Sequence, residues 1–201
     1  YLRVVKDGLK VWMPYKKKGG EVQFVGTGST SFDGGDYVDC GDDTSLDITT
    51  AITISAWVKA DSYAAHSWIA GRDNGTLRNY ALWISDAGKI YWDFWYSNGI
   101  MANTKSTTIL STGTWYHVVS TYDGTNQKVY INGGLEDSDG EASRTIDNDN
   151  VSFAIGAKSN AQSPFNGKIK NVAIWNRALT ATEIQNVMYK TYAEVSGRLA
   201  S

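Results

Sequence analysis

Acidic side chains at alternate positions are the first residues in this chain whose spacing suggests chemistry. Enzymes that cut glycosidic bonds place two carboxylates about 5–9 Å apart, on either side of the scissile bond. The run Asp137-Ser138-Asp139-Gly140-Glu141 comes nearest to that pattern. It follows an Asn-Gly-Gly turn and contains few strand-forming residues, so we predict a solvated acidic loop and no catalytic residue. As metal ligands, Asp137, Asp139 and Glu141 are only weak candidates, because they lack the spacing of an EF-hand loop.

A group of aromatic side chains indicates binding rather than catalysis. Successive strand residues point to opposite faces. In the predicted strands Tyr80–Ser85 and Lys89–Tyr96, the face opposite the apolar set carries Trp83, Tyr91, Asp93 and Trp95. A short turn between the strands would make them neighbours, so these four residues form our predicted carbohydrate-binding site. The alternative is that loops or a second sheet cover them.

Other residues with chemical potential favour structural roles. Tyr63, His66, Trp68 and Arg72 flank a loop that we expect at the rim of the aromatic patch. His66 and His117 are the only histidines, and neither has a second partner at metal-ligand or triad spacing. We therefore predict a packed, hydrogen-bonded His117 and a small buried Cys40, the single cysteine.

Composition excludes several classes of partner. The chain has 201 residues, with 19 Lys and Arg against 21 Asp and Glu. A net charge of −2 leaves no electrostatic footprint for a phosphate backbone, so we expect no nucleic acid. No apolar run approaches the roughly 18 residues that span a bilayer, so we expect no membrane insertion.

The elements that must position these residues are mostly short strands. Strand-like runs separated by Gly, Asn, Asp and Ser clusters predict an all-β sandwich, and no linker divides it, so we expect a single domain over 1–201. The predicted strands are Leu9–Met13, Val22–Val25, Thr30–Phe32, Tyr37–Cys40, Ile52–Lys59, Ser67–Arg72, Tyr80–Ser85, Lys89–Tyr96, Trp115–Tyr122, Lys128–Asn132, Phe153–Gly156 and Gly167–Trp175. One short helix is predicted after the capping box Thr180-Ala181-Thr182-Glu183, with the apolar stripe Ile184, Val187 and Met188.

Five sequence motifs lie in order between residues 31 and 188. The clearest is the hairpin from Trp115-Tyr116-His117-Val118 through Thr121-Tyr122-Asp123-Gly124 to Lys128-Val129-Tyr130-Ile131-Asn132-Gly133. The others are Ser31-Phe32-Asp33-Gly34-Gly35-Asp36-Tyr37-Val38, Ala51–Lys59, Phe165–Ile169 and Ile174–Thr180. Together they resemble the laminin-G-like branch of the concanavalin A-like lectin/glucanase superfamily, and the resemblance implies an antiparallel two-sheet jelly-roll sandwich with one short C-terminal helix. It also implies binding of glycans or proteins, mostly without catalysis.

The resemblance also raises the question of calcium. Many members carry an acidic loop after the first strand and an acidic pair after the closing Phe-x-Gly-x-Ile segment. Here Lys16-Lys17-Lys18-Gly19-Gly20 stands at the first place, and Lys170 and Asn171 at the second. Calcium takes six to eight oxygen ligands, several from carboxylates. We therefore expect no cofactor, with calcium as the one candidate.

Our leading hypothesis is a non-catalytic, lectin-like module that binds a glycan or protein surface. It would serve adhesion or attachment at a cell, filament or virion surface, in an extracellular location. The second hypothesis is a structural decoration protein of a viral capsid or surface filament, working as a homo-oligomer or within the assembly, with exposed aromatic residues as subunit anchors. A glycoside hydrolase or lyase ranks third, because the carboxylate pair is missing.

Overall fold

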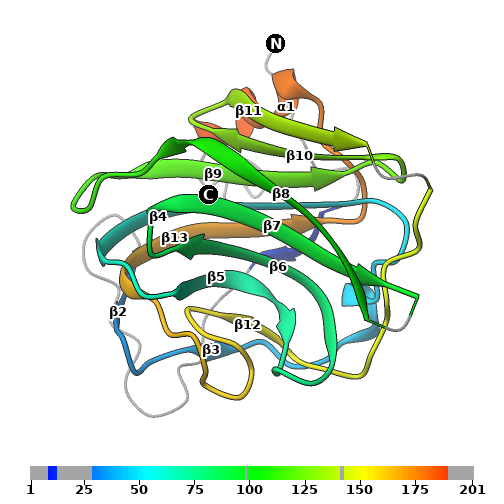
Figure 1. Cartoon of the computed structure of the whole chain (residues 1–201), viewed down its shortest axis with the longest axis horizontal. Coiled ribbons are helices and arrows are strands. Elements are labelled where there is room, and N and C mark those ends of the chain that lie inside the picture. Colours follow the sequence, from blue (N-terminus) through cyan, green and yellow to red (C-terminus); the bar gives the residue numbers. More distant parts are fainter. Residues whose placement is uncertain (1–8, 13–28, 98, 141–142, 190–201) are drawn as a thin grey trace, which may run out of the picture.

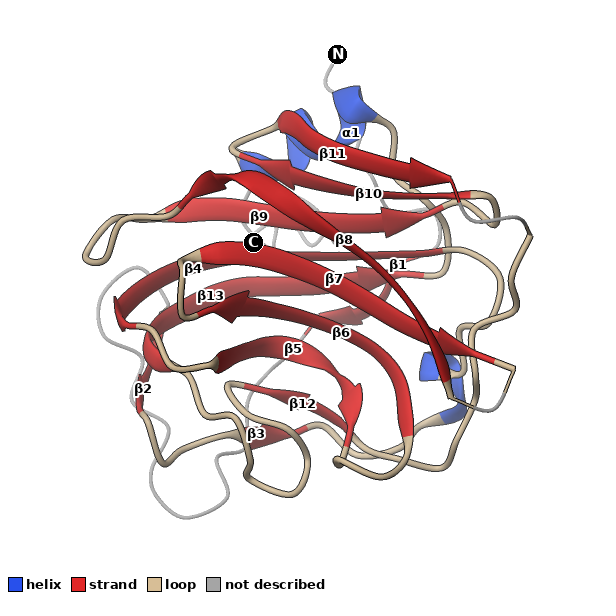
Figure 2. Cartoon of the chain, viewed as in Figure 1, coloured by secondary structure: helices blue, strands red, loops and turns tan. Residues whose placement is uncertain are grey.

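The computed structural model describes residues 9–12, 29–97, 99–140 and 143–189. These residues form two sheets that pack face to face (Figure 1; Figure 2). The elements, in chain order, are β1 (Leu9–Trp12), β2 (Thr30–Asp33), β3 (Val38–Asp39), a 3-10 helix (Thr44–Leu46), β4 (Ile52–Ser62), β5 (His66–Asp73), β6 (Arg78–Ser85), β7 (Lys89–Tyr96), β8 (Ile100–Ile109), β9 (Tyr116–Tyr122), β10 (Asn126–Ile131), β11 (Gly134–Gly140), β12 (Phe153–Ile155), β13 (Asn166–Trp175) and α1 (Ala181–Met188).

All strand pairs are antiparallel, which confirms the predicted jelly-roll sandwich. The seven-stranded sheet has the order β1-β13-β4-β9-β10-β11, with β2 also paired to β13. The six-stranded sheet has the order β3-β12-β5-β6-β7-β8. In the view of Figure 1 the six-stranded sheet lies in front, running from β8 at the top to β3 at the bottom.

The core lies between the sheets and follows the predicted alternation. Ile52, Ile54, Ala56 and Val58 of β4 are all at most 1% exposed. The facing sheet contributes the inward side chains of β6 and β7, Tyr80, Leu82, Ile84, Ile90, Trp92 and Phe94, each fully buried. Because these residues fill the core, their alternate neighbours are left on the outer face of the six-stranded sheet.

Two strands were missed from the sequence. β8 places the small residues Ala102, Thr104 and Ser106 inward, where they are at most 3% exposed, and a mixture of polar and apolar residues outward. Its weak apolar content hid an alternation that the burial pattern makes plain. A predicted strand, Val22–Val25, and the lysine run Lys16–Lys18 lie outside the described residues.

The second missed strand corrects the prediction of an acidic loop at Asp137–Glu141. Residues 134–140 form β11, which pairs with β10 and ends the seven-stranded sheet. The strand is largely exposed, and charged side chains are well tolerated on an edge strand, where they oppose edge-to-edge association. Glu141 lies outside the described residues.

The helix α1 begins as predicted and covers part of the seven-stranded sheet's outer face. The Thr180 hydroxyl accepts from the Glu183 amide, and the Glu183 carboxylate accepts from the Thr180 amide. Arg177 adds a salt bridge of 2.8 Å to Glu183. Ile184 and Val187 are buried in an apolar cluster with Val119, Tyr130, Ala173, Trp175 and Leu179. No described helix is long and apolar enough to cross a membrane.

A tight hairpin joins β6 to β7 and sets the position of the site. Gly88 has φ +74° and donates its amide to the Ser85 carbonyl, a turn conformation that glycine adopts without strain. The resulting register places Trp83 opposite Tyr91 and Ala81 opposite Asp93. The predicted neighbourhood of the two strands is therefore confirmed.

Candidate functional site

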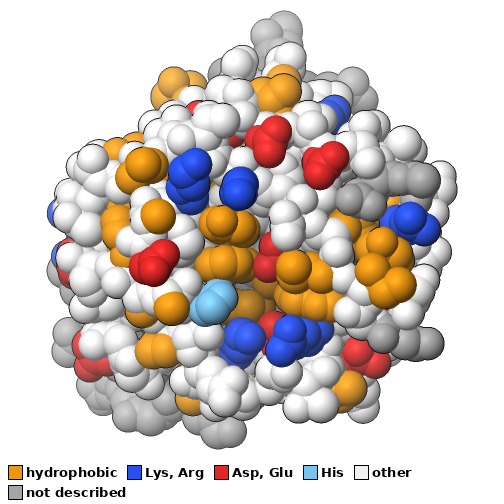
Figure 3. Space-filling view, in the orientation of Figure 1, with side chains coloured by type: hydrophobic (Ala, Val, Ile, Leu, Met, Phe, Trp, Pro, Cys, Tyr) orange, Lys and Arg blue, Asp and Glu red, His pale blue; other side chains and the backbone are white. Residues whose placement is uncertain are grey.

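The outer face of the six-stranded sheet is hollowed into a pocket of about 200 Å³. Figure 3 shows this face, with apolar side chains gathered at its centre around an acidic one, and basic side chains above and below. The lining residues come from β5 to β8 and from the loop after β12: His66, Trp68, Asp73, Arg78, Ala81, Trp83, Tyr91, Asp93, Trp95, Met101, Asn103 and Lys158.

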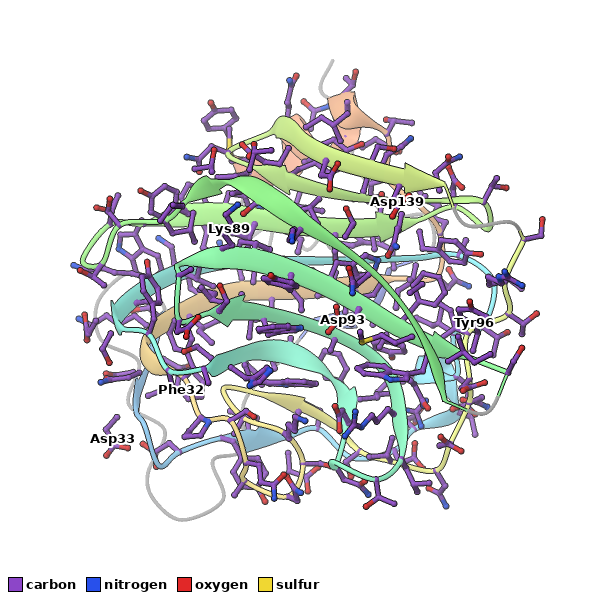
Figure 4. All side chains as sticks on the ribbon, viewed as in Figure 1. Phe32, Asp33, Lys89, Asp93, Tyr96 and Asp139 are labelled. Atoms are coloured by element: carbon purple, nitrogen blue, oxygen red, sulfur yellow. The ribbon has the colours of Figure 1, made fainter. Side chains whose placement is uncertain are left out.

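All four residues of the predicted carbohydrate-binding patch line this pocket. Asp93 and Trp95 point outward from β7 but are only 5% and 6% exposed, whereas Trp83 and Tyr91 are half-buried. Asp93, labelled in Figure 4, lies opposite Ala81, whose methyl group leaves room above it. The role of these residues in binding a glycan stays a prediction.

The aromatic rings form a row rather than the flat platform that their strand positions suggest. The Trp83 ring stacks on Tyr91 with a centroid distance of 4.3 Å and an interplanar angle of 18°. The His66 ring lies 4.6 Å from Trp83 at 41°. Since Trp83 has a ring neighbour on each strand beside it, its faces are largely occupied, and the row offers ring edges to a ligand.

Cations already lie over three of the rings. Arg78 lies 5.5 Å from the centroid of Trp95, and Lys158 lies 5.7 Å from that of Trp68. Lys105 of β8 lies 5.8 Å from the centroid of Tyr91. These cation–π contacts use the negatively polarised ring faces that would otherwise attract a cationic ligand.

The two carboxylates of the pocket differ in how they are neutralised. Asp73 forms a salt bridge of 3.1 Å with Lys158, lies 3.9 Å from Arg78, and accepts the amide of Gly75. Its two oxygens are therefore both engaged. It is also 1% exposed, so it is poorly placed to touch a ligand.

Asp93 is only partly satisfied. One carboxylate oxygen, Oδ2, accepts the Trp83 indole N–H at 2.6 Å, and the other, Oδ1, has no hydrogen-bond partner among the described residues. Burial raises the pKa of Asp93 from 3.8 to about 7, against the opposing effect of the Trp83 hydrogen bond. A buried polar atom without a partner costs about 1–3 kcal/mol, and such atoms are uncommon enough to require an explanation.

A second hollow of about 550 Å³ adjoins the first and shares Arg78 and Trp95 with it. Its remaining lining residues are Gly75, Thr76, Leu77, Gly99, Asp147 and Asp149. The two hollows form one elongated depression that is apolar at one end and polar at the other.

The acidic residues of β11 lie apart from this depression. Asp137 Oδ2 accepts the Thr104 hydroxyl of β8 at 2.9 Å, which ties the edges of the two sheets together. Asp139, on the same strand, is labelled far from Asp93 in Figure 4. Across residues 9–12, 29–97, 99–140 and 143–189, no group of three His, Cys, Asp or Glu side chains could hold a metal ion.

Two of the expected rim residues lie elsewhere. His66 and Trp68 line the pocket, but the Tyr63 hydroxyl donates to the Leu110 carbonyl instead. Arg72 is 1% exposed, and its guanidinium donates to Asp47 at 2.7 Å and to Asp42 and backbone carbonyls. Its position is thus structural, because it pairs with two carboxylates and donates to the carbonyls of Val151 and Leu46.

His117 has the packed position that the sequence predicts. It is 1% exposed, and its Nε2 lies 2.9 Å from the Ser55 hydroxyl. Burial lowers its pKa to about 4, so the ring is neutral near pH 7. Cys40 is partly buried, and burial raises the pKa of its thiol.

Sequence reasoning missed six lining residues: Asp73, Arg78, Ala81, Met101, Asn103 and Lys158. Asp73 and Arg78 occupy the strand ends beside the Asn74-Gly75 turn, and Met101 and Asn103 lie on the unpredicted β8. The alternation of inward and outward residues in β8 would have placed Met101 and Asn103 on the outer face. Lys158 comes from a loop, for which no periodic signal exists.

Comparisons with known proteins agree with this architecture. Domain 4 of AbnA, a GH43 extracellular arabinanase from Geobacillus stearothermophilus solved with arabinotriose, superposes with a TM-score of 0.67 at 22% identity, covering 85% of this chain and 82% of that one. The CBM40 of the Ruminococcus gnavus IT-sialidase, bound to α2,3-sialyllactose, gives a TM-score of 0.68 at 19% identity, covering 80% and 96%. At these identities the likeness shows a shared fold.

A third similar structure is the receptor-binding domain of a botulinum neurotoxin C/D mosaic serotype, with a TM-score of 0.66 at 19% identity. It is matched over 86% of this chain but only 45% of its own length. No curated protein sequence gives a significant match. The laminin G family model described as the concanavalin A-like lectin/glucanases superfamily matches residues 32–185, so the chain belongs to that superfamily.

Proposed function

We propose that the chain is a non-catalytic recognition module that binds a glycan in the aromatic pocket of the six-stranded sheet. One observation carries this proposal: a pocket walled by Trp and Tyr side chains has at its floor a buried carboxylate with a free acceptor atom. Apolar walls with a few convergent polar groups are typical of small-ligand sites. Sugars match them, because they present both C–H faces and hydroxyl donors.

The same geometry supports binding rather than hydrolysis. Canonical glycosidases need two carboxylates that flank the bond. In the pocket both oxygens of Asp73 are engaged by Lys158, Arg78 and the Gly75 amide, which leaves Asp93 as the pocket carboxylate with an unpaired oxygen. One such carboxylate suits a hydrogen bond from a hydroxyl.

The elongated depression favours an oligosaccharide over a single sugar. A first residue would occupy the aromatic hollow, and the chain would continue past Trp95 and Arg78 into the larger polar hollow. The polar lining there provides hydrogen-bond donors and acceptors, with Trp95 as its single aromatic residue.

The biological role that fits such a module is attachment at a cell, filament or virion surface, in an extracellular setting. The fold is shared with a carbohydrate-binding domain solved with a sialylated glycan and with a toxin receptor-binding domain. These neighbours support the proposal through shared architecture.

An array of immobilised neutral and acidic glycans tests the proposal. We expect binding to a small set of glycans. Trp83→Ala and Tyr91→Ala should each lose at least tenfold in affinity, because each variant removes one ring of the stacked row. The matched control is Trp57→Ala, a half-buried tryptophan that packs on His117 on the other sheet. Equal binding by all three variants would place the glycan outside the pocket.

A second candidate function is structural decoration of a capsid or filament. The observation that favours it is a set of exposed apolar side chains near the β8 and β11 edges: Ile100, Ile109 and Leu135, each more than half exposed. Light scattering distinguishes the two functions. A concentration-dependent oligomer that Ile109→Asp disperses, together with an empty array, would favour decoration.

A further inference from the structure

The inference concerns the unpaired oxygen at the floor of the pocket and rests on the proposed glycan-binding function. Asp93 is 5% exposed, and its Oδ2 is held by the Trp83 indole at 2.6 Å, which fixes the carboxylate plane. Its Oδ1 has no partner among the described residues, although it belongs to a residue that lines the cavity. The lining of the pocket therefore includes a buried, unsatisfied acceptor.

The charged groups around Asp93 limit what can satisfy it. β5 contributes His66 and Asp73, β6 contributes Arg78, β7 contributes Tyr91, β8 contributes Lys105, and the loop after β12 contributes Lys158. Lys158 and Arg78 pair with Asp73, and the three cations lie over Trp68, Trp95 and Tyr91. A ligand cation would meet these positive groups at the rim, and a ligand anion at the floor would meet Asp93 itself.

We propose that Asp93 Oδ1 accepts a hydroxyl group of an uncharged sugar residue, and that this contact makes binding release a proton and strengthen as pH rises through neutrality. The hydroxyl donates to the ionised carboxylate, so binding favours the ionised form. Sugar residues that carry a carboxylate or sulfate at this position are disfavoured.

The titration of Asp93 supports the pH dependence. Burial raises its pKa to about 7 in the free protein. A hydroxyl donor on Oδ1 lowers that pKa, so part of the protein population must lose a proton on binding. If only protein with an ionised Asp93 binds the sugar, the dissociation constant is roughly tenfold higher at pH 6 than at pH 8. The ionised fraction of Asp93 changes by about the same factor between these pH values.

The test uses the neutral glycan with the strongest array signal as its probe. Isothermal titration at pH 6, 7 and 8, in buffers with different ionisation enthalpies, gives both affinity and protons released. The wild type should bind about tenfold more weakly at pH 6 than at pH 8 and release a fraction of a proton at pH 7. Asp93→Asn should bind weakly at every pH, with no proton release.

His66 also lines the pocket and lies beside Trp83, so its substitution provides the control. His66→Gln should retain the pH dependence if Asp93 causes it. Should Asp93→Asn fail to fold, the Trp83 indole N–H resonance of the wild type, followed without ligand, must still titrate near pH 7 because Trp83 donates to Asp93.

The outcomes separate the inference from the proposed function. Three results would overturn the inference and leave glycan binding intact. They are a pH-independent affinity in the wild type, loss of the pH dependence of affinity in His66→Gln, or array signals confined to acidic glycans. An array without any signal would overturn both.

Discussion

The two outer faces of the sandwich differ in how they are covered, and the difference supports the proposed position of the binding site. On the seven-stranded sheet, α1 covers a cluster that includes Trp175, which is fully buried. On the six-stranded sheet, the outward aromatic residues wall an open pocket instead. Aromatic side chains therefore stabilise the fold on one face and remain available for binding on the other.

The buried titratable groups show the same contrast. His117, on the seven-stranded sheet, is a neutral ring whose Nε2 lies within hydrogen-bond distance of Ser55. Its Nδ1 has no partner among the described residues, but the ring lines neither of the two hollows. Asp93, on the open sheet, has an unpaired oxygen and a raised pKa in the lining of the pocket. Perturbed groups of the second kind are enriched at functional sites, because folding alone gives no reason to retain them.

The largest expected effect comes from removing a ring on the covered face. Trp175→Ala should lower the free energy of unfolding by about 3–5 kcal/mol, the usual cost of deleting a buried aromatic side chain. Tyr91→Ala, which removes a half-buried ring on the open face, should cost about 1 kcal/mol. Urea unfolding at equilibrium measures both, and similar losses would contradict the distinction between the faces.

A second prediction uses pH to separate Asp93 from His117. The pKa of Asp93 is raised by folding, so its contribution to stability is full below pH 4 and is lost as pH rises to about 7. The pKa of His117 is lowered by folding from 6.5 to about 4, so its contribution is full above pH 6.5 and is lost as pH falls. In the wild type these two effects partly cancel between pH 4 and 7.

Single substitutions should separate the pH dependence of stability that comes from Asp93 from the one that comes from His117. As pH rises from 4 to 7, the free energy of unfolding of Asp93→Asn should increase relative to that of the wild type. The increase is on the order of 4 kcal/mol if the whole pKa shift of Asp93 is realised. As pH rises from 4 to 7, the free energy of unfolding of His117→Gln should fall relative to that of the wild type, by on the order of 3 kcal/mol. Denaturant unfolding at several pH values measures both differences, and parallel profiles for all three proteins would contradict the assignment.

The smallest effect concerns the helix that covers the seven-stranded sheet. Thr180→Ala removes the hydroxyl that caps α1 and should cost about 1 kcal/mol of stability without altering glycan affinity. Thr182→Ala, at an exposed position two residues further on, is the matched control and should change stability by less than about 0.5 kcal/mol. Equal effects of the two substitutions would mean that the cap contributes nothing.

The fold was largely predictable because its core strands alternate strongly. Ile52–Lys59 and Lys89–Tyr96 carry the period of two that separates core from surface, and the Thr180 capping box marks the helix start. β8 and β11 escaped detection because one buries small polar residues and the other is an exposed acidic edge. Each pairs with the strand just before it in the chain, β7 or β10, but neither carries the strong apolar alternation that identifies a strand from its sequence.

The site was predictable only in part, for a related reason. Parity put Trp83, Tyr91 and Asp93 on one face, but it could not show that the rings stack on one another. It also could not show that the cations of Arg78 and Lys158 neutralise Asp73 and leave Asp93 unpaired. Such features depend on which ends of strands and loops meet in space.

The central claim is that the open face of the six-stranded sheet is the binding face, and the tryptophan indole N–H resonances test it most directly. The chain has eight tryptophans, with Trp68, Trp83 and Trp95 in the pocket, and Trp57 and Trp175 on the seven-stranded sheet. On titration with the glycan that the array selects, we expect the indole N–H resonances of Trp83, Trp95 and Trp68 to shift, and those of Trp57 and Trp175 to stay unchanged. Shifts confined to Trp57 and Trp175 would contradict it.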